Sequence, residues 1–331
     1  MQHTSPNSQV KPDDACANSA ESVDNYIEDF LEDCRLQNMT HYSVLSYASA
    51  LRSFKRHLCE QGISDVTKID KDAIREYIRV LREGRNLATS TVENHLSCLS
   101  SFLDYLVYEE VIESNLALAV RKRYLRRYKG DASGDAHKRK LITTKQLKEL
   151  VDSILNVRDK AVVLLLAKTG IRRGELVTIE IDDVDLVGMK VTLKPKAKRS
   201  NRVVFFDEEC GRALQEWLTV RERYASSGCR AFFVTSGGGK LNRNGIYELV
   251  TRHAACVGLH DPKSERLEDH FTPHCLRHWF TTYLRRSGMP REHVQELRGD
   301  ARLDAMDIYY HIDEEELRKS YLAHIPRLGL D

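Results

Sequence analysis

The sequence predicts a mainly α-helical protein of two domains with one small β-hairpin. Its 331 residues are enough for about two domains of ordinary size. Apolar side chains recur at helical spacing through residues 22–118 and again through most of the second half. Two short runs rich in β-branched, apolar and aromatic residues, at 190–193 and 202–206, flank a basic loop and predict the hairpin.

The composition excludes several classes of protein. The 51 Lys and Arg residues nearly balance the 49 Asp and Glu residues, so any nucleic-acid surface must come from local clustering of charge. The longest apolar run, at 161–167, is far shorter than the ~20 residues that cross a bilayer, and the first thirty residues contain no apolar signal-peptide segment. The eight cysteines include no C-x-x-C pair, which argues against a zinc ribbon or a disulfide framework. We therefore expect a cytoplasmic protein with reduced thiols.

The first domain is predicted to be entirely helical. Residues 1–21 are polar and have almost no large apolar side chain, so we expect a disordered arm there. Residues 22–118 have the apolar spacing of about four helices. Gly62 and Gly84 stand where helices should end, and three hydroxyl residues stand where the last long helix should begin, namely Thr89, Ser90 and Thr91.

Residues 119–140 are expected to connect the two domains. Positions 121–140 hold nine Lys or Arg residues against two Asp residues, interrupted by Gly and Ser. Two interpretations fit this composition equally well. Either the segment is an ordinary solvated linker, or it lies along the phosphates of a nucleic acid.

The second domain is predicted to be mixed, with several helices around the hairpin and a further short strand at 232–234. A basic stretch at 194–202 forms the hairpin loop, where it could protonate a leaving oxygen, reach a minor groove, or simply be a solvated run of charge. Apolar spacing predicts helices over the following ranges: 144–155, 158–168, 208–225, 242–256, 273–286, 290–297, 302–311 and 314–323.

An arginine and a glutamate follow the helix that is predicted to end at Gly170. Arg172 then lies near the start of the next helix, where a cation opposes the helix dipole unless an anion binds beside it. Glu175, three residues later, can hold the guanidinium from below and leave its other N–H groups free to bind an oxyanion. The simpler alternative is a surface ion pair.

A histidine and an arginine lie at the start of a later helix. Thr272 suits the N-cap and Pro273 the first helical position, so His274 falls in the first turn, beside unpaired amides that favour phosphate. Arg277 shares its face. An imidazole beside a guanidinium suits the stabilisation of a phosphoryl-transfer transition state. The alternative is a helix start with a buried histidine.

Two adjacent tyrosines are the last chemically informative residues along the chain. Tyr309 and Tyr310 lie near the end of a short predicted helix and are about 100° apart around its axis. Only one of them can therefore face a given pocket.

With these four segments in this order, the chain resembles the tyrosine recombinase, or phage integrase, family, especially its archaeal and Xer-like members. The resemblance rests on the Thr-Gly-x-Arg-x-x-Glu-Leu motif, a hairpin lysine, the His-x-x-Arg-His motif and a tyrosine ten residues after a glycine. It implies a SAM-like helical core-binding domain over 22–118, a linker over 119–140 and a mixed α/β catalytic domain over 141–312.

The resemblance also implies catalytic roles. Arg172 and Arg277 would bind the non-bridging oxygens of the scissile phosphate, and His274 would bond the phosphate and assist proton movement. Tyr309 would attack phosphorus, leaving a 3′-phosphotyrosyl enzyme and a free 5′-hydroxyl. Neither ATP nor a metal ion is implied, because one phosphodiester is exchanged for a phosphotyrosine of similar energy.

Supporting roles follow in the same way. Lys196 best matches the hairpin lysine that protonates the leaving oxygen, and Lys198 is the alternative because this loop is one residue longer than in common family members. Glu175 would be the supporting carboxylate, and His278 would have a structural role behind the phosphate. The family usually has His or Trp where this chain has Asp300. Because an ionised carboxylate cannot donate a hydrogen bond, Asp300 is protonated, braces an arginine or faces elsewhere.

Double-stranded DNA is the partner that the resemblance implies, held in a clamp between the two domains. The helix over 89–101 would face the DNA and the linker would run along it, which favours the second interpretation of that segment. The expected contacts come from this helix, the linker and the hairpin loop: Thr89, Ser90, Thr91, Asn94, His95, Arg121, Lys122, Arg123, Arg126, Arg127, Lys198, Arg199 and Arg202.

Residues 313–331 are predicted to form an amphipathic terminal helix with an acidic start. In the family such a helix docks on a neighbouring protomer and couples cleavage at paired sites within a tetramer. Docking on its own domain is the alternative. Accessory DNA-bending proteins are further partners that the resemblance allows.

Two other functions remain open on the sequence alone. One is a DNA-binding regulator that has kept the clamp but lost cleavage through Asp300. The other is a type IB topoisomerase, which would use a similar pocket to swivel and reseal one strand. The target site, and the choice among integration, excision and dimer resolution, are not readable from these residues.

Overall fold

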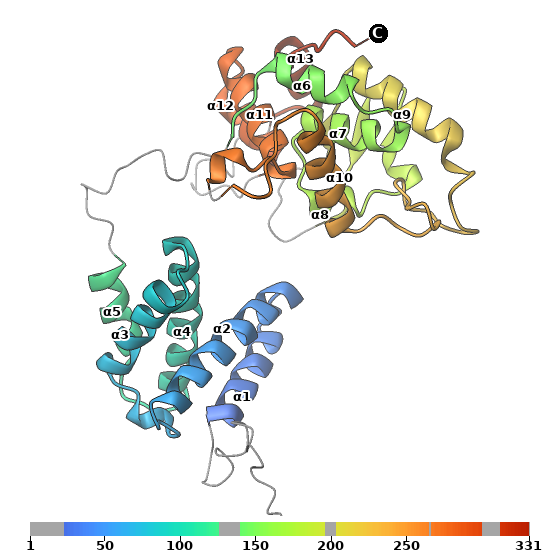
Figure 1. Cartoon of the computed structure of the whole chain (residues 1–331). Helices are drawn as coiled ribbons and strands as arrows, with labels where there is room; N and C mark the ends of the chain where they lie inside the picture. Colours follow the sequence, from blue (N-terminus) through green and yellow to red (C-terminus); the bar gives the residue numbers. More distant parts are fainter. Residues whose placement is uncertain (1–22, 126–139, 196–202, 265, 300–311, 331) are drawn as a thin grey trace, which may run out of the picture. The chain divides into compact units, whose positions relative to one another are not determined.

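The computed structural model describes residues 23–125, 140–195, 203–264, 266–299 and 312–330. The chain divides into two compact units, which we call the helical unit (Met1–Ala132) and the C-terminal unit (Ser133–Asp331). Their described parts are mostly helical and include one small antiparallel sheet (Figure 1), which confirms the predicted fold class. No described helix is both long enough and apolar enough to span a membrane. The predicted arm at 1–21 lies outside the described residues.

Residues 23–125 of the helical unit form five α-helices, with a 3-10 turn at Val66–Lys68 and a π turn at Val80–Gly84. The α-helices are α1 (Val23–Leu36), α2 (His41–Glu60), α3 (Lys71–Arg79), α4 (Thr89–Tyr108) and α5 (Leu116–Tyr124). Helix α4 contributes one apolar face to the core, with Leu96 and Phe102 fully buried. The Phe30 ring of α1 meets Phe102 edge to face, with ring centroids 5.6 Å apart.

Local signals explain most of these helix ends. Thr40 and Asp70 cap α2 and α3 through side-chain oxygens that accept backbone N–H groups. Gly62 follows α2 in the left-handed conformation, with φ 71°, as its predicted stop requires. Helix α4 begins at Thr89 as predicted, but its N-cap is Ala88 and no side chain caps it. The hydroxyls of its first turn therefore remain available at the surface.

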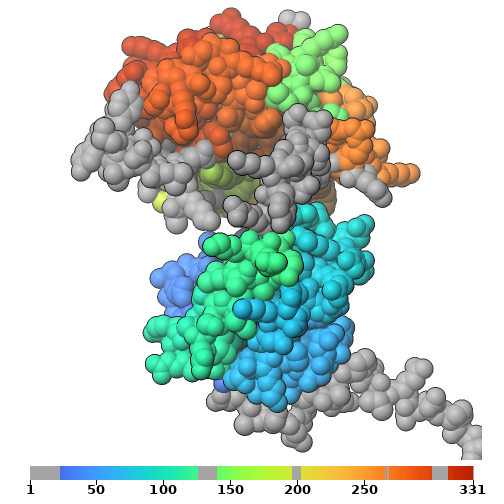
Figure 2. Space-filling model, turned by 90° about the vertical axis from the view of Figure 1, so that its left-hand side faces the viewer, coloured from blue at the N-terminus to red at the C-terminus, as the bar shows by residue number. Residues whose placement is uncertain are grey.

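The helical unit extends further than the predicted boundary at residue 118. Asn115 caps α5 by accepting from the N–H groups of Ala117 and Leu118. Val120 is only 3% exposed within the core, and Arg121 donates to Ser97 on α4 at 2.8 Å. The space-filling view shows the end of α5 beside α3 (Figure 2), where Arg82 donates to the carbonyl of Tyr124. The basic charge of this stretch is typical of a linker, but its apolar residues pack in the core of the helical unit.

The C-terminal unit is arranged around helix α7 (Val157–Thr169), which lies in its middle (Figure 1) and is buried on all sides over 161–169. The other helices are α6 (Thr144–Asp152), α8 (Arg173–Leu176), α9 (Glu208–Arg221), α10 (Arg243–Cys256), α11 (Pro273–Arg286), α12 (Arg291–Arg298) and α13 (Glu314–His324), with 3-10 turns at Ile181–Asp183 and Leu267–Asp269. Helices α9, α10 and α11 pack directly against α7.

The predicted hairpin is confirmed, and it has one more strand than expected. Strands β1 (Val184–Asp185), β2 (Lys190–Thr192) and β3 (Val203–Phe205) form an antiparallel sheet in that order. Val191 lies opposite Val204, and both are fully buried. The expected strand at 232–234 is wrong, since Val234 makes only an isolated bridge to Lys240. The helix expected over 302–311 lies outside the described residues.

The terminal helix α13 packs on its own unit, the alternative to docking on a neighbour. Leu317, Tyr321, Ile325 and Leu328 are buried in the same apolar core as α7. Figure 2 shows this C-terminal segment, in red, against the surface of the orange segments that precede it. The amphipathic pattern of residues 314–324 is therefore satisfied within the single chain.

Candidate active site

A close approach of two helices sets the geometry of the site. Helix α7 ends at Gly170, which is left-handed with φ 61°. A Cβ at this position would lie 2.3 Å from the Phe280 ring of α11, so only glycine fits. The chain beyond α7 therefore turns directly against α11, and the two predicted arginine motifs come together.

Arg172 occupies the N-cap of the short helix α8, and Glu175 holds it from below as predicted. The Glu175 carboxylate accepts the Arg172 backbone N–H at 2.7 Å and lies 3.3 Å from its guanidinium. The Glu175 side chain is 4% exposed, whereas that of Arg172 is 43% exposed. The carboxylate is thus buried beneath a guanidinium that reaches solvent, where it can bind an anion.

Arg277 is the buried member of the pair, at 4% exposure. Its Nη1 donates to the carbonyl of Gly170 at 2.5 Å and its Nη2 donates to the carbonyl of Arg298 at 3.0 Å. Both carbonyls lie at helix C-termini, since α12 ends at Gly299 in the left-handed conformation. The negative ends of two helix dipoles therefore stabilise this buried cation.

His274 lies where the sequence analysis placed it, in the first turn of α11. Pro273 is the first helical residue and Thr272 is the N-cap, although the contact that closes this cap uses the Cys275 sulfur, which lies 3.4 Å from the Thr272 nitrogen. His274 is exposed, and His278 one turn later is half-buried. His274 is therefore at the surface, as a phosphate contact requires.

These residues line an open cleft of about 340 Å³. The described residues of its walls include three arginines and one histidine, and none of these described residues is a carboxylate: Ile171, Arg172, Arg173, Tyr247, Thr272, Pro273, His274 and Arg277. A concentration of fixed cations in a small cleft favours a phosphate or another oxyanion. Among the described residues, no group of three or more His, Cys, Asp or Glu side chains is placed to hold a metal ion.

Two polar residues of this cleft, Arg173 and Tyr247, were not predicted from the sequence. Arg173 lies with its guanidinium 5.8 Å from the ring centroid of Tyr247, an exposed residue of α10. The second arginine of the Arg-Arg pair could have suggested Arg173. Nothing in the local pattern of α10 marks Tyr247, because its role depends on how α10 packs beside α8.

Several predicted site residues lie outside the described part of the chain: Lys196, Lys198, Arg199, Arg202, Asp300 and Tyr309 in the C-terminal unit, and Arg126 and Arg127 in the linker. The described base of the hairpin holds Lys194, which donates to Asp183 at 3.1 Å. That hydrogen bond, together with the nearby Glu180, raises the pKa of Lys194. Lys194 is therefore a charged anchor below the loop.

The predicted DNA-facing residues of the helical unit that the structure describes lie in the first turns of α4 and the last turn of α5. Thr89, Ser90, Thr91 and Asn94 are exposed on α4, and Lys122 and Arg123 are exposed on α5. The bond from Arg121 to Ser97 joins the two helices at this surface. His95 is half-buried, with Nδ1 2.9 Å from the Tyr77 hydroxyl, and burial together with Arg85 lowers its pKa.

Comparison with known proteins matches both units to one family. Residues 140–316 match the phage integrase family, and residues 23–110 match the N-terminal SAM-like domain of phage integrases. The tyrosine recombinase XerC of Bacillus subtilis (strain 168) is 30% identical over 324 residues, which cover 93% of this chain and 98% of that protein. XerC of Vibrio cholerae (strain ATCC 39541) is 26% identical over 295 residues, which cover 88% and 89%.

Solved structures share the fold. A lambda integrase dimer bound to a COC′ core site matches with a TM-score of 0.65 at 15% identity, over 89% of this chain and 100% of that one. The XerH site-specific recombinase bound to difH substrate matches with a TM-score of 0.61 at 22% identity, over 91% and 84%. The family match and the similarity to XerC over nearly the whole chain agree with the motifs that the cleft contains. The chain belongs to the phage integrase family of tyrosine recombinases.

Proposed function

We propose that this protein is a site-specific DNA recombinase that cuts and rejoins DNA strands through a 3′-phosphotyrosyl intermediate. The observation that carries the proposal is the cleft whose described walls bring Arg172, His274 and Arg277 together. Relatives named tyrosine recombinases span nearly the whole chain. Two of the structures that share its fold contain DNA sites, as their titles state.

The two arginines act on the charge that develops at phosphorus. As the attacking oxygen approaches, negative charge grows on the non-bridging oxygens, and fixed guanidinium groups stabilise it most when they need no reorganisation. The buried contacts of Arg277 and the Glu175 contact beneath Arg172 supply this preorganisation. His274 bonds the same phosphate and assists proton movement.

Strand cleavage exchanges one bond for another. The Tyr309 phenol loses its proton, its oxygen bonds to phosphorus, and the bond to the 5′-oxygen breaks. Lys196 gives a proton to that oxygen, with Lys198 as the alternative donor. Attack by a 5′-hydroxyl reverses the steps and reseals the strand, so no external energy source or cofactor is needed. His278 supports the phosphate contacts from behind, and Asp300 is protonated, braces an arginine or faces elsewhere.

The helical unit would hold the duplex beside the cleft. The exposed start of α4, the basic end of α5 and the linker through residue 140 are suited to phosphates and sugars. The hairpin loop adds cationic side chains from the other unit. We expect the protein to act in the cytoplasm as a tetramer on paired sites, with accessory DNA-bending proteins as optional partners. Its task is integration, excision or dimer resolution.

Covalent trapping tests the proposal directly. Nicked suicide DNA, prepared from fragments that flank the gene, is incubated with the unchanged protein, with Tyr309→Phe and with Tyr310→Phe, and adducts are separated on an SDS gel. We expect a covalent band that only Tyr309→Phe abolishes. A band lost only in Tyr310→Phe would move the nucleophile by one residue.

Other outcomes would overturn the recombinase proposal. Tight binding to a mapped site without any adduct would favour the DNA-binding regulator. Relaxation of a supercoiled plasmid without exchange between sites would favour a type IB topoisomerase.

A further inference from the structure

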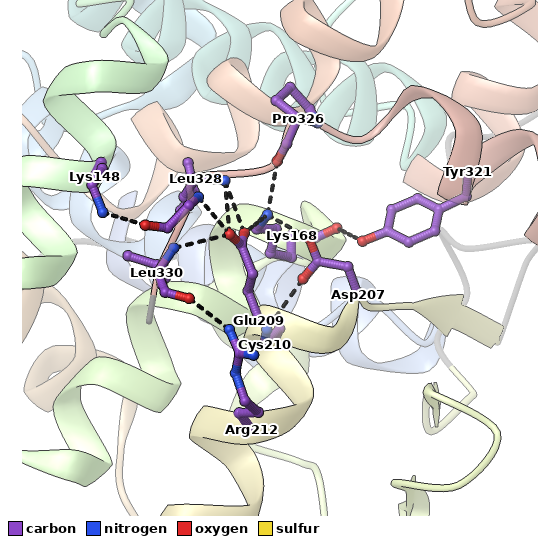
Figure 3. A network of polar contacts seen from close by, with 11 residues as sticks. Lys148, Lys168, Asp207, Glu209, Cys210, Arg212, Tyr321, Pro326, Leu328 and Leu330 are labelled. Carbon is purple, nitrogen blue, oxygen red and sulfur yellow. Dashed lines mark hydrogen bonds and ion pairs between the residues drawn. The ribbon is translucent and has the colours of Figure 1, made fainter.

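A lysine is completely buried at the end of α7, in the network that Figure 3 shows. Lys168 has 0% exposure, and its ammonium donates to Asp207 at 2.5 Å and to Glu209 at 2.7 Å. A third bond, at 2.8 Å, goes to the carbonyl of Pro326 in the C-terminal tail. Burying such a group costs more desolvation free energy than an apolar side chain of similar size would, so stability alone is a weak reason for its presence.

The tail that follows α13, residues 326–330, is bound through its main chain. Glu209 accepts the N–H groups of three successive tail residues at 2.6 to 3.2 Å: Leu328, Gly329 and Leu330. Lys148 and Arg212 donate to tail carbonyls at 2.5 and 2.6 Å. The Glu209 carboxylate binds the tail's donors and cations bind its acceptors, so the tail completes the hydrogen bonding around Lys168 and Glu209 (Figure 3).

The charge on Glu209 depends on these partners. Burial acts to raise its pKa, but the Lys168 ammonium and the tail N–H groups outweigh burial, so the pKa is lowered. The carboxylate therefore remains ionised as long as the tail is bound. Loss of the tail would leave two carboxylates beside one ammonium, without three of the N–H donors.

The same stretch of chain holds the arginines of the cleft. The main-chain carbonyl of Lys168 accepts from the buried Tyr321 hydroxyl of α13 at 2.9 Å. Two residues later, the carbonyl of Gly170 accepts from Arg277, and Arg172 follows after another two residues. The tail, α13 and both arginines are thus joined through one five-residue segment of backbone.

We propose that Lys168 is a positioning residue for DNA cleavage, which couples the docked C-terminal tail to the placement of Arg172 and Arg277. The proposal rests on the recombinase function proposed above. Lys168 touches no reacting atom and acts through the turn that follows it. Misplacing a catalytic group by about 1 Å can slow a reaction up to ~10²-fold, so loosening this turn should reduce cleavage while leaving DNA binding nearly intact.

Three variants open the network at different points: Lys168→Met, Glu209→Gln and a chain that ends at Ile325. For each we would measure the single-turnover cleavage rate on saturating suicide DNA and, separately, the dissociation constant for an uncleavable duplex. We expect the cleavage rate to fall roughly 10- to 100-fold with the dissociation constant changed less than about twofold. A synthetic peptide of residues 326–331 should partly restore the rate of the shortened chain but not that of Lys168→Met.

Asp159→Asn is the matched control. Asp159 is a buried ion at the other end of α7, 2% exposed, where it contacts Arg158, Arg252 and His253. Its loss should lower stability without touching the arginine turn. Cleavage by Lys168→Met at the unchanged rate, or slowed no more than in Asp159→Asn at equal folded fraction, would overturn the proposal.

Hydrogen exchange separates failure of this inference from failure of the proposed function. Removing the tail should speed amide exchange in residues 169–176 even without DNA, because the turn loses its anchor. Unchanged exchange there would refute the coupling whatever the cleavage assay shows. If the unchanged protein forms no adduct on its mapped site but the exchange does speed up, the recombinase function fails and the anchoring of the turn stands.

Discussion

The two units of this protein bury different kinds of side chain. In the described residues of the helical unit, the buried polar side chains are His57 and Ser100, and the core is otherwise apolar and aromatic. The described C-terminal unit buries several charged groups, among them Asp159, Lys168 and Arg277. Buried charge is concentrated in the unit that must present cations at fixed positions. In the unit that we expect to hold the duplex, none of the described Asp, Glu, Lys and Arg side chains is buried.

Two buried arginines of the C-terminal unit offset the cost of desolvation in the same way, by donating to backbone carbonyls. Arg221, 1% exposed, donates to the carbonyls of Cys229 and Ala231 at 2.6 Å each. Arg277 likewise donates to carbonyls, those of Gly170 and Arg298. Only Arg277 also lines the cleft. Hydrogen bonds to backbone carbonyls therefore fix a loop through Arg221 and fix a candidate phosphate ligand in the case of Arg277.

The largest expected effect is on the apolar core of the helical unit. Phe102→Ala should lower the free energy of unfolding by about 3–5 kcal/mol, because the fully buried ring would leave a cavity. Urea unfolding of the full chain, followed by a probe in this unit, measures the change. Tyr108→Ala, at a residue 80% exposed, is the control and should change it by less than about 0.5 kcal/mol. Similar losses in the two variants would contradict the cavity argument.

The next largest effect is expected from substituting one of the two buried arginines. Arg277→Lys should slow single-turnover cleavage by about 10²–10³-fold, since an ammonium cannot hold both carbonyls and bind phosphate with the same geometry. Arg221→Lys should destabilise the unit but change the cleavage rate of folded protein by only a few fold. Equal rates for the two folded variants would show that Arg277 is structural and does not act on the phosphate.

A smaller effect is expected beneath Arg172. Glu175→Gln keeps the shape of the side chain but removes the charge that holds the backbone N–H and guanidinium of Arg172. We expect a roughly 10-fold slower cleavage rate, the size of one weakened charge-assisted hydrogen bond. Single-turnover rates on saturating DNA provide the test, and a loss of DNA affinity with an unchanged rate would argue against an orienting role.

The smallest expected effect is the pH dependence of the helical unit. Burial, together with Arg85, lowers the folded-state pKa of His95, so the unfolded chain binds more protons at mildly acidic pH. Stability is therefore present above the unfolded pKa of about 6.5 and is lost as pH falls from there toward the lowered folded value. Urea midpoints between pH 8 and 5 should show a shallower decline in His95→Asn than in the unchanged protein. Parallel curves would mean that other groups cause the decline.

Local rules within the sequence determined the helices and the chemical types of the site residues. Thr272 and Pro273 fix the start of α11, and Gly170 fixes the end of α7, because capping and left-handed turns act over a single helical turn. The β-branched, apolar and aromatic residues of the two β runs predicted the hairpin. The spacing of Arg172 and Glu175 predicted their contact, which also spans less than one turn.

Only the tertiary structure decided which distant groups hold one another. The Gly170 carbonyl that Arg277 binds lies 107 positions away from it, and the tail carbonyl bound by Lys168 lies 158 positions away. The continuation of the helical unit through α5 and the place of Tyr247 in the cleft were equally hidden, and the structure decided between the two docking sites that the sequence left open for α13. Burial of a charge depends on partners that no local pattern encodes, because desolvation is offset only when the whole fold brings those partners within hydrogen-bond distance.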